Sequence, residues 1–282
     1  MTSQAPTPAD VERRHDANSA LYDLCLGPSH HIGAWLADDL DQSGTAWDQV
    51  ARAQERMVDH LAALLDPHPG DHILDIGFGS GASAIRLART RDVRVTGCSV
   101  SRTEVRLATT LAEHAGMTEK VTFEHGNAMA LRHPDNCFDG IWAIESIDYM
   151  NNPLRALTHA HRVLKPQGKA VITIANRRRD LDPGEQRFWW RQFAMCLPLS
   201  IPELVDHAHD AGFTIDQATD VGEELHIART WDLWAELYQQ NKTTLTHHYG
   251  AEGIVAMDSG ITTLLSVLTG KLSCAILTLH KE

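Results

Sequence analysis

The chain has 282 residues, a formal charge of −12, and 43% hydrophobic and 6% aromatic residues. This length is enough for one α/β domain with insertions. An acidic chain is a poor partner for nucleic acid or an anionic membrane, since both reward a basic surface. No run of 18 apolar residues is present to cross a bilayer.

Cysteine and histidine usage argues against a metal or disulfide framework. The five cysteines are scattered and form no C-x-x-C pair. The 17 histidines are spread out, and the adjacent pairs His30–His31 and His247–His248 are not at ligand spacing. The N-terminus is polar and lacks the apolar core of a signal peptide. We therefore expect a cytoplasmic protein without a bound metal.

The N-terminal part predicts helices. Residues 10–66 read as helical, and in 47–65 apolar residues recur at intervals of three and four. We interpret residues 1–66 as an N-terminal helical arm or lid. Such an arm could also pair two copies of the chain in a homo-oligomer.

From residue 67 onward, short apolar strands alternate with helices. We expect strands at 72–77, 93–100, 121–128, 138–146 and 169–176. Helices are expected between them at 82–90, 102–116 and 153–164, with a turn at 165–168. This alternation is typical of βαβ units and of a doubly wound, mostly parallel α/β sheet.

The alternation is interrupted after the fifth strand. We predict a lid insertion at about 176–200, then a helix at 201–212 and a strand at 213–221. A second insertion at about 223–269 reads as helical, and an apolar strand follows at 272–280. One domain, residues 67–282, would carry both insertions.

Three glycines follow the first strand, in the stretch HILDIGFGSGASA. Gly77, Gly79 and Gly81 allow a tight turn and let a ligand approach the main chain. Asp75, on the strand, can accept a hydrogen bond or orient the loop. In open α/β sheets, ligands bind beyond the carboxyl ends of the strands.

The glycine loop also fits the dinucleotide pattern G-x-G-x-x-A. A nicotinamide oxidoreductase would need an acidic residue about 20 positions further on. The second strand ends there in Cys98 and Ser99. A hydroxyl grips a ribose more weakly than a carboxylate does, so this alternative is disfavoured but left open.

Five stretches together resemble class I S-adenosylmethionine-dependent methyltransferases, in the small-molecule branch of bacterial secondary metabolism, with sterol and tocopherol methyltransferases as more distant relatives. They are LDIGFGSG, VTGCSVSRTEV, VTFEHGNAMAL, CFDGIWAIESIDYMNNPLRAL and RVLKPQGKAVI, in the family's order. The resemblance implies a seven-stranded, Rossmann-like sheet whose last strand is antiparallel. It also implies S-adenosylmethionine as cofactor and S-adenosylhomocysteine as product.

The resemblance implies a set of cofactor contacts. The glycines would pack against the methionine half, Ser99 would replace the acid that many members offer to ribose, and Asn127 would replace the aspartate beside adenine. Tyr22, His31 and Trp35 would close over the cofactor as a lid. The expected cofactor residues are Tyr22, His31, Asp75, Gly77, Gly79, Gly81, Ser99, Ser101, Arg102, Asn127, Ala128, Ile144 and Glu145.

The acceptor chemistry depends on the residues after the fourth strand. Relatives that methylate hydroxyls commonly carry paired histidines there, whereas this chain has Asp148 and Tyr149. An exposed carboxylate is a poor base unless burial raises its pKa. We therefore interpret the protein as a C-methyltransferase that alkylates a prenyl or terpenoid alkene through a carbocation. An indole alkaloid, as in teleocidin-type C-methyltransferases, is one candidate acceptor.

Aromatic faces would stabilise such a cation. The expected substrate-binding rings are Trp142, Tyr149, Phe188, Trp189 and Trp190. The expected catalytic residues are Glu145, Asp148, Tyr149 and Tyr22.

Three alternatives stay open. One is O-methylation of a sugar or polyketide hydroxyl with Asp148 as base, and another is a protein that binds the cofactor without transferring a methyl. The arginines at 177–179 predict either a diphosphate-bearing substrate or a solvated charged loop.

Overall fold

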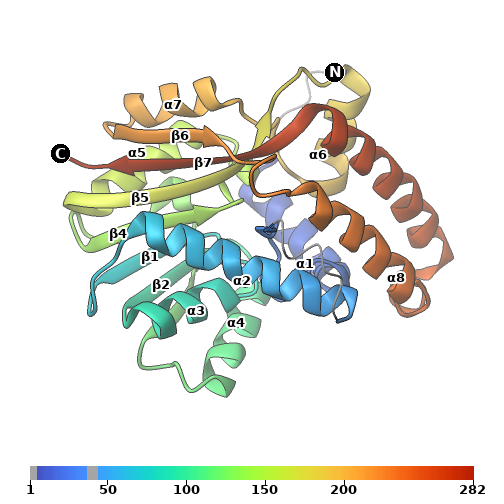
Figure 1. Cartoon of the computed structure of the whole chain (residues 1–282), viewed down its shortest axis with the longest axis horizontal. Helices are drawn as coiled ribbons and strands as arrows, with labels where there is room; N and C mark the ends of the chain where they lie inside the picture. Colours follow the sequence, from blue (N-terminus) through green and yellow to red (C-terminus); the bar gives the residue numbers. More distant parts are fainter. Residues whose placement is uncertain (1–4, 37–43) are drawn as a thin grey trace.

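The computed structural model describes residues 5–36 and 44–282 (Figure 1). Its centre is a seven-stranded sheet with the strand order β3-β2-β1-β4-β5-β7-β6. β7 runs antiparallel to both its neighbours, β5 and β6, while the pairs from β3 to β5 are parallel. The predicted doubly wound α/β fold with an antiparallel last strand is confirmed.

The strand boundaries lie close to those predicted. The strands are β1 (His72–Ile76), β2 (Arg94–Ser99), β3 (Val121–His125), β4 (Phe138–Ile144), β5 (Leu164–Arg177), β6 (Thr214–Asp220) and β7 (Leu272–His280). The expected turn at 165–168 is wrong, because this segment lies within β5. The pairing register with β4 shifts between Phe138 and Gly140 there, so the extra residues form an irregularity of the strand.

Most helices begin at a strong capping signal. The helices are α1 (Pro8–Cys25), α2 (Ala46–Leu65), α3 (Ala82–Arg91), α4 (Arg102–His114), α5 (Pro153–Val163), α6 (Pro183–Phe193), α7 (Ile201–Asp210) and α8 (Ala228–Lys271), with short 3-10 helices η2 (Ala128–Ala130) and η3 (Ile147–Tyr149). Reciprocal capping boxes start α1, α2, α6 and α7. Gly250, with φ of 73°, interrupts α8.

Two helical layers cover the sheet. On one face, Met57 and Leu61 of α2 pack with Leu87 of α3 and Ile73 of β1. On the other face, α5 and α7 contribute residues such as Leu157 to a second core. Helix α2 is therefore a layer of the sheet rather than part of a lid.

The prediction of one helical region over 10–66 is wrong in part. The segment 26–36 is not helical and separates α1 from α2, and residues 37–43 lie outside the described residues. The domain boundaries at 66 and 67, like the homo-oligomer, stay predictions.

The remaining helices gather at one end of the sheet. In Figure 1, α1, α6 and α8 lie on the right, beyond the end at which the parallel strand β5 finishes. α1 contacts both α8 and α4 within the chain. Within the described ranges, no helix is long and apolar enough to span a membrane.

Candidate active site

A cavity of about 270 Å³ lies between the strand ends and these helices. Two groups of residues line it, which we name by the elements that supply them. The strand-end wall comes from β1, β2, β4 and the segments that follow β1, β2, β3 and β4: Asp75, Gly77, Gly79, Ser99, Glu104, Asn127, Ala128, Ile144, Glu145, Asp148 and Tyr149. The helical wall comes from α1, α6, α8 and the segment after α6: Val11, Leu21, Tyr22, Cys25, Trp189, Met195, Trp231, Trp234, Ala235, Tyr238, Met257 and Ile261.

The glycine loop forms a cradle in the strand-end wall. Gly77 has φ of 76°, and a Cβ built on it would lie 2.4 Å from Cβ of Ser146. Gly79 has φ of 55°, and a Cβ there would meet nothing closer than 3.9 Å. The backbone at Gly79 is therefore open toward the cavity, which suits a ligand that packs on the main chain.

A carboxylate that the sequence analysis missed completes the end of β2. Ser99 donates a hydrogen bond through Oγ to Oε2 of Glu104 at 2.5 Å, and Nδ1 of His15 lies 2.8 Å from Oε1. Burial alone would raise the pKa of Glu104, but His15 and the two hydrogen bonds outweigh it, so this pKa is lowered. Glu104 thus places an ionised carboxylate beside the serine that stands where an acid was expected.

Asp75 is 2% exposed, and its Oδ2 has no hydrogen-bond partner among the described residues. Burial raises the pKa of its carboxyl to about 7. A cationic group in the cavity would favour the ionised form of Asp75. The site therefore fits a positively charged ligand.

Asp148 and Glu145 follow β4 and reach the same cavity. Asp148 is 2% exposed; Oδ2 accepts a hydrogen bond from N of Ala175 at 2.9 Å, while Oδ1 is buried without a partner among the described residues. Burial raises the pKa of Asp148 to about 7, although the Ala175 N–H opposes the shift. Asp148 needs a shift in this direction to act as a base near neutral pH.

Glu145 has a left-handed backbone, with φ of 49°, and its Oε1 accepts a hydrogen bond from N of Ile32 at 2.9 Å. Its backbone N–H donates to Oγ1 of Thr173 at 2.9 Å. Burial raises the pKa of Glu145 to about 8, with a smaller contribution from Asp148. A strained backbone held by several partners is common at functional sites.

The segment 26–36 is held firmly against the domain. Gln54 donates hydrogen bonds from Nε2 to the carbonyl oxygens of Leu26 and His31, both at 2.6 Å. The His31 ring lies 2.7 Å from O of Ile32 and 3.1 Å from Oγ of Ser83, and burial lowers its pKa to about 4. His31 is therefore a neutral residue fixed in the cavity lining.

Trp35 does not close over the cavity as expected. It is 1% exposed, and its Nε1 donates to Oγ1 of Thr230 at 2.9 Å. Tyr22 and Tyr149 do line the cavity, and both rings meet the His15 ring edge-on, with centroids 5.5 Å and 4.7 Å away. The covering element is α1, which carries Tyr22 and His15.

Several other predicted site residues lie outside the cavity lining. They are Gly81, Ser101, Arg102, Trp142, Phe188 and Trp190. Gly81 precedes α3, where a Cβ would lie 2.7 Å from Ala108 and Phe123 side chains, so it serves close packing. Ser101 caps α4 and donates to Oδ1 of Asp16, while Arg102 is largely exposed.

The aromatic rings of Trp142, Phe188 and Trp190 lie outside the cavity lining for different reasons. Trp142 is fully buried in the core on the α2 side, because alternate residues of β4 face opposite sides of the sheet. Phe188 and Trp190 flank Trp189 on α6, and consecutive helical residues point about 100° apart. Of the three neighbouring aromatic residues on α6, Trp189 lines the cavity, whereas Phe188 and Trp190 do not.

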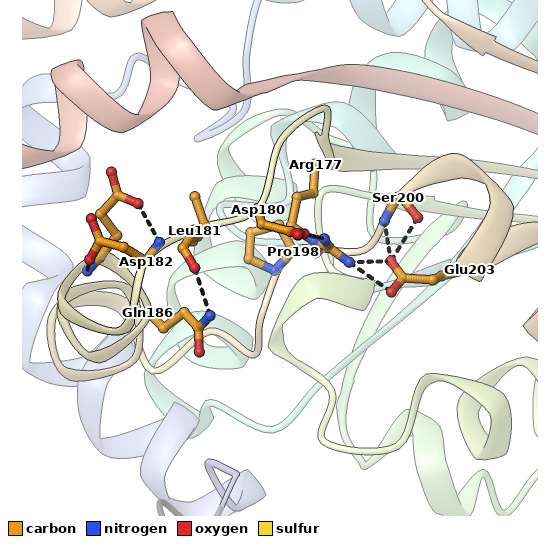
Figure 2. A network of polar contacts seen from close by, with 9 residues as sticks. Arg177, Asp180, Leu181, Asp182, Gln186, Pro198, Ser200 and Glu203 are labelled. Atoms are coloured by element: carbon orange, nitrogen blue, oxygen red, sulfur yellow. Dashed lines mark hydrogen bonds and ion pairs between the residues drawn. The ribbon is translucent and has the colours of Figure 1, made fainter.

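The arginine cluster is engaged with carboxylates outside the cavity. Figure 2 shows Arg177 between Glu203, Asp180 and the carbonyl of Pro198; its Nη2 lies 2.7 Å from both Glu203 carboxylate oxygens. Arg178 pairs with Asp220 at 2.8 Å. Arg177 joins the two ends of the 176–200 insertion, and Arg178 links it to β6. Two of the three arginines are thus held by carboxylates, while Arg179 is exposed, so the diphosphate substrate stays a prediction.

Comparison with known proteins identifies the family. A family model described as a methyltransferase domain matches residues 74–172. The chain is 32% identical over 249 residues to the 27-O-demethylrifamycin SV methyltransferase of Amycolatopsis mediterranei (strain S699), covering 87% of this chain and 88% of the relative. The chain is a class I S-adenosylmethionine-dependent methyltransferase. The nicotinamide oxidoreductase alternative is therefore wrong.

Other relatives of this methyltransferase act in small-molecule metabolism. The (+)-O-methylkolavelool synthase of Herpetosiphon aurantiacus is 33% identical over 80% of this chain and 78% of its own. The crystal structure of the [4+2]-cyclase SpnF superimposes with a TM-score of 0.82 at 28% identity, covering 98% of this chain and 97% of that one. The methyltransferase uses S-adenosylmethionine as cofactor.

Proposed function

We propose that the enzyme transfers a methyl group from S-adenosylmethionine to a hydroxyl oxygen of a small molecule, with Asp148 as the general base. The observation that carries this proposal is the buried Asp148 carboxyl in the cavity wall, whose Oδ1 has no partner among the described residues. Burial raises the pKa of this carboxyl to about 7, near the value at which a base works best at neutral pH.

Each residue of the site has a role in this reaction. The bound cofactor supplies an electrophilic methyl group on a sulfonium. The hydroxyl of the acceptor would donate a hydrogen bond to Oδ1 of Asp148. Its proton would move to that oxygen as the carbon–oxygen bond forms and the methyl–sulfur bond breaks, which leaves S-adenosylhomocysteine. The Ala175 N–H keeps Oδ2 in place. Alignment and exclusion of water supply the rest of the rate enhancement.

The strand-end wall holds the cofactor in this proposal. Gly77 and Gly79 cradle the methionine half, and Asp75 balances its positive charge. Ser99 and Glu104 bind the ribose hydroxyls, with His15 keeping Glu104 ionised and oriented. The side-chain amide of Asn127 binds adenine through Nδ2. Its Oδ1 already accepts a hydrogen bond from N of Met129, which fixes the orientation of the amide.

Two observations favour oxygen over carbon as the acceptor atom. Trp142, Phe188 and Trp190, three of the rings expected to stabilise a carbocation, lie outside the cavity lining. The relatives named above are described as O-demethylrifamycin and O-methylkolavelool enzymes. Carbon methylation would have to use Tyr149 and Trp189, which do line the cavity, and it is the outcome that would displace the proposal.

The test uses S-adenosylmethionine with a trideuterated methyl and a mixture of polyketide alcohols, terpenoid alcohols and prenylated indoles. Mass spectrometry finds products that gain the heavy methyl, and NMR places it. We expect a methyl ether, and Asp148→Asn should lower kcat by about 10²–10⁴-fold, the usual contribution of a general base. Asp232→Asn, the same change at an exposed site on α8, is the control.

The pH profile separates a base from a packing residue. Because Asp148 must be ionised to accept the proton, kcat of the wild type should rise with pH through about 7 and then level off. Asp148→Asn should remove this rise without changing affinity for S-adenosylhomocysteine. A methyl on alkene carbon, or an unchanged pH profile in the variant, would overturn the proposal.

A further inference from the structure

We propose that the helical wall binds an uncharged, largely apolar acceptor and that the indole N–H of Trp234 donates a hydrogen bond to a second uncharged oxygen of that acceptor. This inference rests on the proposed function and names the class of its acceptor. The hydroxyl that is methylated is the first oxygen and lies at Asp148.

The charges around the cavity disfavour an anionic acceptor. Among the described residues that line it, none is lysine or arginine, whereas four carry carboxyl groups: Asp75, Glu104, Glu145 and Asp148. Moving a phosphate or carboxylate from water into such a lining costs its hydration, and no lysine or arginine of the lining compensates for the loss.

The histidines of the lining do not supply that missing cation. His15 is paired with Glu104, and Nε2 of His30 lies 3.3 Å from Oδ1 of Asp23. His31 is neutral, as its lowered pKa and its two ring hydrogen bonds indicate. A negative group on the acceptor would therefore compete with carboxylates for each of the nearby basic groups.

The helical wall offers surfaces suited to an apolar skeleton. Trp189 and Met195 come from α6 and the segment after it, and Trp231, Tyr238 and Met257 from α8. Aromatic rings provide large rigid contact areas, and thioethers adapt to irregular shapes. This combination binds an extended hydrocarbon or polycyclic framework by apolar burial.

Trp234 is the polar exception in this wall. Its Nε1 is buried and has no hydrogen-bond partner among the described residues. The ring is fixed against Trp231, with centroids 4.8 Å apart and planes at 70°. An unpaired buried donor is costly, and buried tryptophan N–H groups usually find a partner. An ether, hydroxyl or carbonyl oxygen on the acceptor would supply it.

The test measures binding of a matched probe series to enzyme saturated with S-adenosylhomocysteine, by calorimetry at about pH 8. The probes are dodecanol, dodecanediol with a hydroxyl at each end, and the ω-hydroxy acid of the same length. We expect the diol to bind several-fold more tightly than the mono-alcohol. The hydroxy acid should bind at least about tenfold more weakly than the diol, as expected for an uncompensated charge.

Two variants locate the interaction. Trp234→Phe keeps an aromatic ring but removes the N–H, so it should reduce diol affinity to that of the mono-alcohol. Ala235→Leu should block all three probes by filling the wall, without changing S-adenosylhomocysteine affinity. Ala251→Leu, the same change at an exposed position of α8, should leave every affinity unchanged.

Three outcomes would overturn the inference: no binding of the diol, equal binding of the hydroxy acid and the diol, or equal loss of diol and mono-alcohol affinity in Trp234→Phe. A different result tests the proposed function. If the diol binds as expected but no methyl ether forms with labelled S-adenosylmethionine, the acceptor class stands and the role of Asp148 fails.

Discussion

The two walls of the cavity are built in opposite ways. The strand-end wall is rich in polar groups, and the ends of parallel strands together with the short segments after β1, β2, β3 and β4 supply it. The helical wall is mainly apolar and combines α1, α6 and α8, which are far apart in the chain. In the proposed reaction the strand-end wall would hold the cofactor and the helical wall would select the acceptor, with His15 of α1 as a contact between the two.

Replacement of the first loop glycine should have the largest effect. Gly77→Ala puts a Cβ 2.4 Å from that of Ser146 at φ of 76°, and we expect about a hundredfold loss of S-adenosylhomocysteine affinity, since positive φ alone costs about 1–2 kcal/mol. Gly116→Ala is the control, because Gly116 has φ of 65° but open space around a Cβ. Equal affinity in both variants would show that the cradle is not tight.

Asp148, which lies in the strand-end wall, should lower the stability of the fold at the pH at which it acts as a base. The pKa of Asp148 is raised to about 7 in the fold, above its ordinary value near 4. Because the fold favours the protonated carboxyl, its contribution to the free energy of unfolding is fully present below about pH 4. This contribution is lost as the pH rises through about 7. Asp148→Asn should therefore raise the free energy of unfolding at pH 8 by roughly 2 kcal/mol relative to wild type.

Denaturant unfolding at two pH values checks this prediction. The gain of Asp148→Asn should shrink at about pH 5, where wild-type Asp148 is protonated in the fold. A gain that does not depend on pH would mean that ionisation of Asp148 carries no penalty.

The carboxylate of Glu104 beside Ser99 should contribute to cofactor affinity. Glu104→Gln keeps an acceptor for the Ser99 hydroxyl but removes the charge paired with His15, so we expect about tenfold weaker S-adenosylhomocysteine binding, in line with hydrogen bonds to charged groups. Affinity for dodecanol should not change. Glu113→Gln, at an exposed site on the same helix, is the calorimetric control.

The smallest effect should come from replacing Arg177, whose contact with Glu203 holds the segment that carries α6. Arg177→Lys loses the two-pronged contact with Glu203 seen in Figure 2, and Lys cannot reproduce that geometry. We expect a loss of about 1 kcal/mol in unfolding free energy and a rise in acceptor KM, with S-adenosylhomocysteine affinity unchanged. A parallel loss of cofactor affinity would show that the walls are coupled.

Much of the strand-end wall could be predicted from the sequence because its residues follow apolar strands directly. Gly77, Gly79, Ser99 and Asn127 all line the cavity as expected. Glu104 was missed for a physical reason: the run from Ser101 to Glu104 reads as an ordinary S-x-x-E capping box. In the structure its side chain turns to Ser99 and His15 instead.

The helical wall resisted prediction because apolar residues on a helix read the same whether they face a core or a cavity. Trp231, Trp234 and Met257 gave no local signal that separates them from core residues such as Leu233. Trp142 was wrongly predicted to bind substrate, although the alternation of side chains along β4 could have assigned it to the α2 face of the sheet. The raised pKa of Asp148 could not be predicted either, because it comes from burial that only the fold creates.

The contact between α1 and α8 bears on how the enzyme matures during synthesis. The N–H of Leu21 donates to the Tyr249 hydroxyl at 3.2 Å, and Asn241 donates from Nδ2 to the carbonyl oxygen of Leu24 at 3.1 Å. Helix α1 is synthesised before α8, and its partners on α8 emerge more than 200 residues later. The contacts that hold α1 over the glycine loop can therefore form only after α8 has been made, so we expect retention of the cofactor to begin only then.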